Sequence, residues 1–296
     1  MKTSLSLIVF IFAVSSVSFS SCKNKESELK VYSEKDALKT DIPVNEENKF
    51  YASSTRKNFP PENVFDYDDK TFWSPEKNVI DEWLAVYVGK LENLGKFSEC
   101  DIVIWDGYIN YDDESKEFIK PTKYKIELYA DENLILKQVI SKTKYNSDSG
   151  YPGYIESNFD FQNLKYENGI IWVKVTILEA EKTESAAIRD IKLSFKNANP
   201  YNAYNEISLF CNAINQSEKN VLSNFTDNPT EEVLDQFTSE FVPEDGPGCR
   251  MESFEVHSEE IVSLHAVEGG DGGSRAFFKY DKGKWKLYKY AYFSYF

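Results

Sequence analysis

Residues 83–89 read WLAVYVG, a short apolar run with β-branched and aromatic side chains at most positions. Alternate side chains of a strand point to opposite faces, and here both alternating sets are apolar. A run of this length that is apolar on both faces is typical of a strand covered on both sides. The stretch therefore predicts a central strand in a layered β structure.

Five further runs of similar length follow, and clusters of Asp, Asn, Gly, Pro and Lys separate them. They are CDIVIWDGY at 100–108, YKIELYA at 124–130, LILKQVI at 134–140, IIWVKVTIL at 170–178 and IRDIKLSF at 188–195. Short strands with turn residues between them are the pattern of an antiparallel sandwich. We predict a mainly β fold with about eight strands in a domain spanning 48–197.

The pattern changes after about residue 200. Apolar residues recur at helical spacing from Ile207 to Ile214, and a second helical pattern follows Asn228-Pro229, which predicts an N-cap with proline at the first helical position. Alternating stretches then run to the C-terminus, with turn residues at 258–259, 269–273 and 281–283. Residues 200–296 are predicted to form a small α+β domain of unknown role.

The N-terminus has the layout of a secretory signal, with Lys2, an apolar run at 5–14 and small residues before Cys22. The apolar run is too short to cross a bilayer. Phe19-Ser20-Ser21-Cys22 resembles a bacterial lipobox, in which the cysteine is acylated and becomes the N-terminus. Residues 1–21 are therefore predicted to be a lipoprotein signal peptide; ordinary cleavage with Cys22 as a bystander is the alternative.

Residues 22–47 are charged and poor in aromatic residues, as expected of a tether, with a short helix as an alternative. By analogy with bacterial lipoproteins, Lys23 in place of Asp favours the outer over the inner membrane. We expect an exported protein held in the cell envelope through its N-terminal lipid alone. The 49 Asp and Glu outnumber 34 Lys and Arg, for a net charge of −15. This charge disfavours nucleic acid as a partner.

The middle region resembles the discoidin domain, also called the coagulation-factor type C or galactose-binding-like domain. The anchors follow in the family's order: ASS at 52–54, PENVFDYDDKTFWS at 61–74, EWLAVYVG at 82–89, IVIWDGY at 102–108 and AAIRDIKLSF at 186–195. Asp106-Gly107-Tyr108 and Lys120-Pro121 are more similar to the bacterial NADase-type glycan-binding variant. The resemblance implies a jelly roll that binds a glycan or a glycosylated partner with loops at one end.

The residues 48–197 contain no histidine, so the His-Arg-Asn set of the galactose-binding relatives is not expected here. The remaining ligand-binding candidates are Arg56, Asn58, Tyr108, Tyr111, Tyr145, Tyr151 and Tyr154. An exposed tyrosine offers a ring for stacking on a sugar and a polar tip. Because the chain has 19 tyrosines, each is also open to the simpler interpretation of an ordinary surface residue.

The same resemblance implies a structural calcium site. In this sequence Asp66, Asp68 and Thr71 occupy the family's tight turn, with Tyr67 in place of its glycine, and Asp190 is the nearest match to the acid that completes the site. Calcium prefers such oxygen ligands. The alternative is a turn whose side chains bond only to its own backbone.

Three more cysteines would share the oxidising compartment of an exported protein. Cys211 and Cys249 lie in the same C-terminal segment and could form a disulfide, whereas Cys100 lies within a strand pattern and is predicted to be a buried thiol.

No HExxH, GxSxG, P-loop or GxGxxG signature occurs in the sequence. His257 and His265 alternate with apolar residues and lack a metal-spaced partner or a nearby nucleophile in a strained turn. We predict a non-catalytic binding or adhesion protein with no certain cofactor. Two alternatives remain: an accessory or toxin-like enzyme whose C-terminal domain carries the chemistry, or a structural envelope protein without a soluble ligand.

Overall fold

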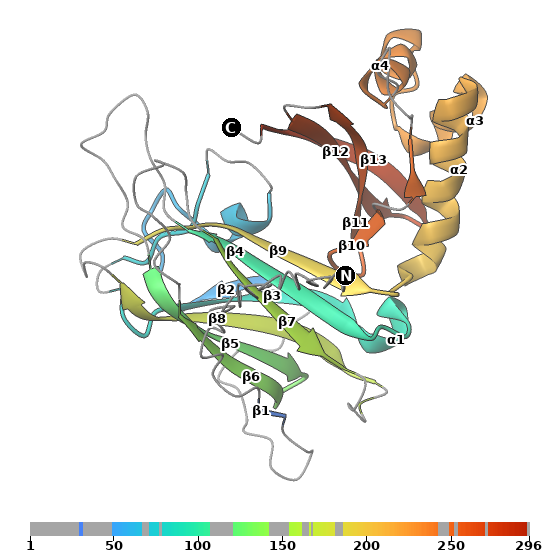
Figure 1. Cartoon of the computed structure of the whole chain (residues 1–296). Coiled ribbons are helices and arrows are strands. Elements are labelled where there is room, and N and C mark those ends of the chain that lie inside the picture. Colours follow the sequence, from blue (N-terminus) through green and yellow to red (C-terminus); the bar gives the residue numbers. More distant parts are fainter. Residues whose placement is uncertain are drawn as a thin grey trace, which may run out of the picture.

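Figure 1 shows a computed structural model of the chain. It describes residues 30–31, 49–66, 71–76, 79–106, 121–141, 154–161, 166, 168–180, 186–241, 249–251, 254–269 and 272–294. The candidates Cys22, Asp68, Tyr108, Tyr111, Tyr145 and Tyr151 lie outside these residues.

Two antiparallel sheets form a sandwich. One has the strand order β1-β6-β5-β8-β3-β2 and the other β7-β4-β9. The strands are β1 (Lys30–Val31), β2 (Phe50–Ala52), β3 (Trp83–Lys90), β4 (Glu99–Asp106), β5 (Pro121–Ala130), β6 (Asn133–Ser141), β7 (Tyr154–Asp160), β8 (Ile170–Ala180) and β9 (Ile188–Lys196). The prediction of a mainly β, antiparallel sandwich is confirmed, and the described part of each of the six quoted runs falls on one strand.

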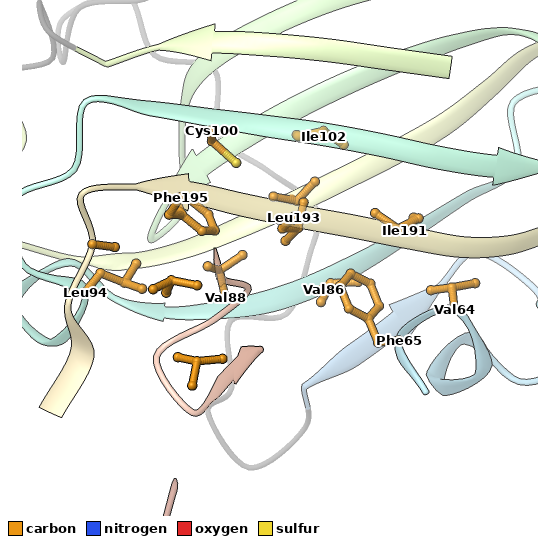
Figure 2. Close-up of a cluster of buried hydrophobic side chains, with 14 of the residues drawn as sticks. Val64, Phe65, Val86, Val88, Leu94, Cys100, Ile102, Ile191, Leu193 and Phe195 are labelled. Carbon is orange, nitrogen blue, oxygen red and sulfur yellow. The ribbon is translucent and has the colours of Figure 1, made fainter. Parts of the chain in front are cut away.

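Strand β3 is buried on both faces, as its sequence predicts. Figure 2 shows Val86 and Val88 of β3 together with Ile191, Leu193 and Phe195 of β9 in the core between the sheets. On the other face, Ala85 and Tyr87 belong to a smaller cluster around Trp172. Each large apolar side chain buried in this way contributes about 1.5–3 kcal/mol, so β3 connects two apolar layers. Trp73 is fully buried.

Three edge strands of the sandwich, β1, β2 and β7, were not predicted. In β7 only every second residue is buried, and one of the buried residues is Ser157, so its apolar signal is weak. Strand β1 lies within the predicted tether, where Lys30 and Val31 pair with Lys137 and Leu136 of β6. Strands β1 and β2 span only two and three residues, which is too few to show a periodic apolar pattern.

The C-terminal part contains three helices followed by one antiparallel sheet. The helices are α2 (Ala203–Gln216), α3 (Lys219–Leu222) and α4 (Glu231–Phe241). The sheet has the order β10-β11-β12-β13, with β10 (Phe254–Val256), β11 (Ile261–Gly269), β12 (Gly272–Asp281) and β13 (Lys284–Ser294). Phe210 of α2 packs against Phe278 of β12 with ring centroids 4.9 Å apart. Helices therefore cover one face of this sheet.

The predicted start of the second helix is wrong by two residues. Helix α4 begins at Glu231, and the Thr230 hydroxyl accepts a hydrogen bond from the Val233 backbone N–H at 3.3 Å. A threonine hydroxyl can satisfy an unpaired N–H of a first helical turn as well as an asparagine can. Thr230 therefore takes the role predicted for Asn228. In the described part of the chain, no helix is long and apolar enough to span a membrane.

The C-terminal sheet packs beside β9, an edge strand of the sandwich (Figure 1). His257, which follows β10, contacts the Leu193 carbonyl oxygen of β9 through its Nδ1 atom. Lys192 of β9 forms an ion pair of 2.9 Å with Glu255 of β10. These contacts satisfy polar groups that an exposed sheet edge would leave to solvent.

Candidate functional site

Strands β4, β7 and β9 have neighbouring ends at one end of the sandwich. In the strand register, Trp105 of β4 pairs with Tyr154 of β7 and Asp190 of β9, and Trp73 bridges to Ile188. The chain segments that hold Tyr108, Tyr111, Tyr145 and Tyr151 join strands here, but these residues lie outside the described ones. Of the seven predicted ligand-binding residues, the structure describes Arg56, Asn58 and Tyr154.

Tyr154 is exposed at this end, with 45% of its surface accessible. Its ring lies against the ring of Trp105 at a centroid distance of 4.9 Å and an interplanar angle of 43°. The alternation of β4 explains the position of Trp105, because Cys100, Ile102 and Ile104 point into the core and Trp105 points outward.

Two charged residues of β9 border the rings. The Arg189 guanidinium lies 5.4 Å from the centroid of Trp105, within the range of a cation–π contact. Its Nε atom is 3.4 Å from the Asp190 carboxylate. We name these four residues, Trp105, Tyr154, Arg189 and Asp190, the Trp105 surface. It combines ring faces with hydrogen-bond donors and a carboxylate acceptor, the chemistry that recognises a sugar ring and its hydroxyls.

Sequence reasoning missed Trp105 and Arg189. The signal for Trp105 was present in CDIVIWD at 100–106, where it shares an alternating set with Asp101 and Val103 rather than with the buried isoleucines. A tryptophan on the outward side of a strand is informative, since buried rings are the usual case. For Arg189 no such signal exists, because its contact with Trp105 depends on strand pairing.

Arg56 and Asn58 lie at the same end but in a different place. The Arg56 backbone N–H donates to the Ser74 carbonyl at 2.9 Å, and Trp73 in turn bonds to Ile188 of β9. Adjacent strands are ~4.8 Å apart, so the Arg56 backbone is separated from β4 by the 73–74 segment and β9. The structure therefore does not bring Arg56 into the Trp105 surface, and Asn58 is an exposed turn residue.

The described part of the predicted calcium set does not form a cation site. The Thr71 hydroxyl donates to the Asp66 carboxylate at 2.7 and 2.9 Å, and the Lys289 ammonium donates to the Asp66 carbonyl oxygen. Asp190 is paired with Arg189 instead. Among the described residues no cluster of three or more acidic, histidine or cysteine side chains could hold a metal ion. These residues therefore do not fit a calcium ion on their own, and with Asp68 outside the described residues the site stays a prediction.

The predicted disulfide between Cys211 and Cys249 is not formed in the structure, although the two side chains lie next to each other. Both are buried free thiols in the structure. A hydrogen bond between the two side chains lowers the pKa of Cys211 and raises that of Cys249. The Asn215 side chain bonds to both backbone groups of Cys249, at 2.9 and 3.0 Å, and so fixes it beside α2. Cys100 is a fully buried thiol, as predicted.

His257 and Ser263 form the nearest approach to a catalytic pair. His257 Nδ1–H donates to the Leu193 carbonyl, so Nε2 accepts from the Ser263 hydroxyl at 2.7 Å. Burial lowers the pKa of His257 to about 3, and neither residue is more than 1% exposed. An enclosed pair has no room for a substrate, so this histidine has a structural role. The side chain of His265 lies outside the described atoms.

Comparisons with known proteins give structural similarity only. No family model matches the sequence, and no curated protein matches it. A family 32 carbohydrate-binding module from Clostridium perfringens in complex with galactose aligns with 19% identity and a TM-score of 0.27, over 48% of this chain and 89% of that one. A second module from the same organism, in complex with GlcNAc-α-1,4-galactose, aligns with 17% identity and a TM-score of 0.30, over 50% and 90%.

A family 89 glycoside hydrolase from Clostridium perfringens in complex with PUGNAc aligns with 16% identity and a TM-score of 0.33. That alignment covers 76% of this chain but only 23% of the hydrolase. At these TM-scores, the similarities establish neither a family nor a function for this chain.

Proposed function

We propose that this protein binds a glycan or a glycosylated partner through the Trp105 surface. The observation that carries the proposal is the exposed ring of Tyr154 against Trp105, beside the Arg189–Asp190 pair. A sugar stacks on an aromatic ring through its C–H face, and its hydroxyls then reach charged side chains at the rim. We propose binding without chemistry, since the described residues of this surface offer two ring faces and a guanidinium that is already paired with a carboxylate.

Two features set the expected strength of binding. The Trp105 ring is held by contacts with Tyr154 and Arg189, so little side-chain entropy is lost when a ligand stacks on it. The ligand nevertheless remains largely exposed to water on one side. We expect a dissociation constant between micromolar and millimolar, or roughly 4–8 kcal/mol of binding free energy.

A glycan array tests this proposal with the soluble chain that begins at residue 23, which retains β1. Trp105→Ala and Tyr154→Ala are each expected to abolish binding to the ligand that the array identifies. Leu209→Ala is the control, because Leu209 of α2 is 53% exposed and lies in the C-terminal part. An array without a positive signal, or binding that survives both ring substitutions, would show that the Trp105 surface is not a glycan site.

We further propose that the protein is attached to the bacterial cell envelope through lipid on Cys22, with the outer membrane as its location. The support is the sequence itself, because small residues precede Cys22 and a charged segment follows it. Two or more acyl chains are needed for stable anchoring. The variant Cys22→Ala should therefore move the protein from the detergent phase to the aqueous phase in a detergent partition. Retention in the detergent phase would contradict lipidation.

A further inference from the structure

A cavity of about 600 Å³ lies between the sandwich and the C-terminal part. The sandwich contributes Ser98 and Glu99 at the start of β4 and Ser194 and Asn197 at the end of β9, and the C-terminal part contributes Tyr204 and Phe254. Small-molecule sites have volumes of ~300–1,000 Å³ and occur preferentially where two domains meet. Strand β4 runs from Glu99 to Asp106, and a strand rises ~3.4 Å per residue, so the cavity lies at the opposite end from Trp105.

Aromatic side chains form one wall of this cavity. Tyr204 is 46% exposed, and its ring packs perpendicular to that of Phe254, at 88° and a centroid distance of 5.6 Å. The backbone N–H of Tyr204 donates to Asn199 Oδ1 at 2.8 Å. The Phe254 contact positions the ring and the Asn199 bond fixes the backbone behind it, while much of the ring surface remains open. A ligand that stacks on it loses little entropy in ordering the protein.

The opposite wall is polar but balanced in charge. Lys196 Nζ lies 2.8 Å from the Glu99 carboxylate, and Asn158 Nδ2 donates to the same carboxylate at 3.3 Å. Asn197 Nδ2 donates to Ser98 Oγ at 3.1 Å. Because these charges compensate one another, an ionic ligand would gain little electrostatic binding free energy in this cavity. Amide and hydroxyl groups remain to pair with a neutral, hydroxylated molecule.

We infer that this cavity is a second binding site, and that it takes a neutral saccharide unit. Its rings stack on one face of the sugar, while Ser194, Asn197 and Asn199 bond to the hydroxyls. The site requires both parts of the molecule and is independent of the Trp105 surface. With a site at each end of the sandwich, the protein would hold two sugar units of one glycan, or two glycans, at a fixed separation. Once one site is occupied, binding of the same glycan at the second site is intramolecular, which raises the overall affinity.

Amide NMR spectroscopy tests the inference with the ¹⁵N-labelled chain from residue 23. The probes are galactose, N-acetylglucosamine and lactose, each added to about 20 mM, a range that detects millimolar binding. We expect saturable shifts of the Ser98, Asn197 and Phe254 amides with at least one probe. Tyr204→Ala should weaken binding about tenfold, which corresponds to ~1.4 kcal/mol. Tyr204→Phe, which keeps the aromatic ring, should bind the probe as the unchanged protein does, and so should the control Leu209→Ala.

The Trp105 surface provides an internal comparison. In Tyr154→Ala, the shifts at Ser98, Asn197 and Phe254 should persist. If Tyr204→Ala lowers the melting temperature, Ser194→Gln serves as the second variant, since its longer side chain fills the cavity from the sandwich side and should block the probe. The inference is overturned if no probe shifts these amides, if Tyr204→Ala and Ser194→Gln both bind normally, or if shifts occur only around Trp105 and Tyr154. Only the last result would leave the proposed function supported.

Discussion

Lys192 and Lys196 lie four residues apart on the same side of β9, yet their surroundings differ. Lys196 is half exposed and pairs with Glu99 and Asp101 at 2.8 and 3.3 Å, on the solvent-exposed part of the outer face of the small sheet that forms one wall of the cavity. We call this part the open face. The hydrogen bonds that its ammonium donates to these carboxylates raise its pKa. Lys192 pairs with Glu255 at 2.9 Å beneath the C-terminal sheet, and burial lowers its pKa although Glu255 opposes that shift. Two lysines of one strand therefore have pKa values shifted in opposite directions, because the C-terminal sheet buries one of them and leaves the other exposed.

Glu259 of the C-terminal part inserts its side chain into the sandwich, in addition to the contacts of His257 and Glu255 with β9. Glu259 is only 5% exposed and accepts hydrogen bonds from Tyr87 Oη, from Lys90 N at 3.1 Å and from Asn93 Nδ2 at 2.6 Å. Gly89 leaves the space for it, since a Cβ there would lie 2.6 Å from the Cβ of Glu259, and its φ of +146° is one that other residues rarely adopt. The open face has no comparable insertion among its described residues.

The largest effect on stability is expected from the two neighbouring thiols of the C-terminal part, Cys211 and Cys249. Oxidation by a disulfide reagent removes two protons and two electrons from the thiols and closes a loop of about 40 residues, which should stabilise the fold by roughly 4 kcal/mol. We expect the oxidised protein to lose about 2 Da and to melt at a higher temperature than the reduced one. Equal melting temperatures of the two forms would show that the structure does not accommodate the bond without strain.

Glu259→Ala should cost about 3 kcal/mol, because the Tyr87 hydroxyl and the Asn93 amide would lose a buried acceptor. Glu260→Ala is the matched control in the same turn, since Glu260 pairs with Lys49 in a partly exposed contact. The comparison is made by urea unfolding of both variants. If both variants lose the same unfolding free energy, the buried Glu259 side chain contributes no more than the partly exposed Glu260 to the contact between the sandwich and the C-terminal part.

Acid should weaken the contact between the sandwich and the C-terminal part, because His257 lies at that contact. Its pKa is lowered by burial to about 3 in the folded protein, whereas an unfolded histidine titrates near ~6.5. Stability is therefore complete above the unfolded pKa and falls as the pH decreases from about 6.5 toward 3. The free energy of unfolding measured across this range should drop by a few kcal/mol, and His257→Gln should flatten the slope. An unchanged slope in the variant would assign the acid sensitivity to other groups.

Glu255 adds to acid sensitivity at lower pH. Burial would raise its pKa, but Arg275 at 2.8 Å, His257 and Lys192 outweigh that effect and lower it to about 2. Its stabilising contribution is present above the unfolded value of ~4.3 and disappears as the pH falls through about 2. The His257 variant should therefore retain a residual slope below about pH 4.

The smallest effect is expected on the open face. Glu99→Gln removes the charge opposite Lys196, and exposed ion pairs contribute about 0–1 kcal/mol. The unfolding free energy should change far less than in Glu259→Ala, and less still in high salt. A loss as large as that of Glu259→Ala would mean that the open face is covered in solution, for example by another molecule.

The candidate site was predicted only in part. Tyr154 was named from the sequence because it lies in a loop rich in Gly and Ser, although it begins a strand. Its partners Trp105 and Arg189 were not named, since each comes from a different strand and only the register joins them. Arg56 was named because it follows an anchor in sequence, but the 73–74 segment separates it from β9.

The sequence alone determined six strands of the sandwich, the burial of β3 on both faces, the positions of α2 and α4 to within a few residues and the burial of Cys100. Each follows from the spacing of apolar residues along a short stretch, and such spacing reflects local backbone geometry. The tertiary structure decided which polar residues meet: Glu259 with the space above Gly89, His257 with the Leu193 carbonyl, and Tyr204 with Phe254 at the cavity. These contacts join residues far apart in the chain, and their energy comes from burial and directed hydrogen bonds that exist only once the strands and sheets have paired.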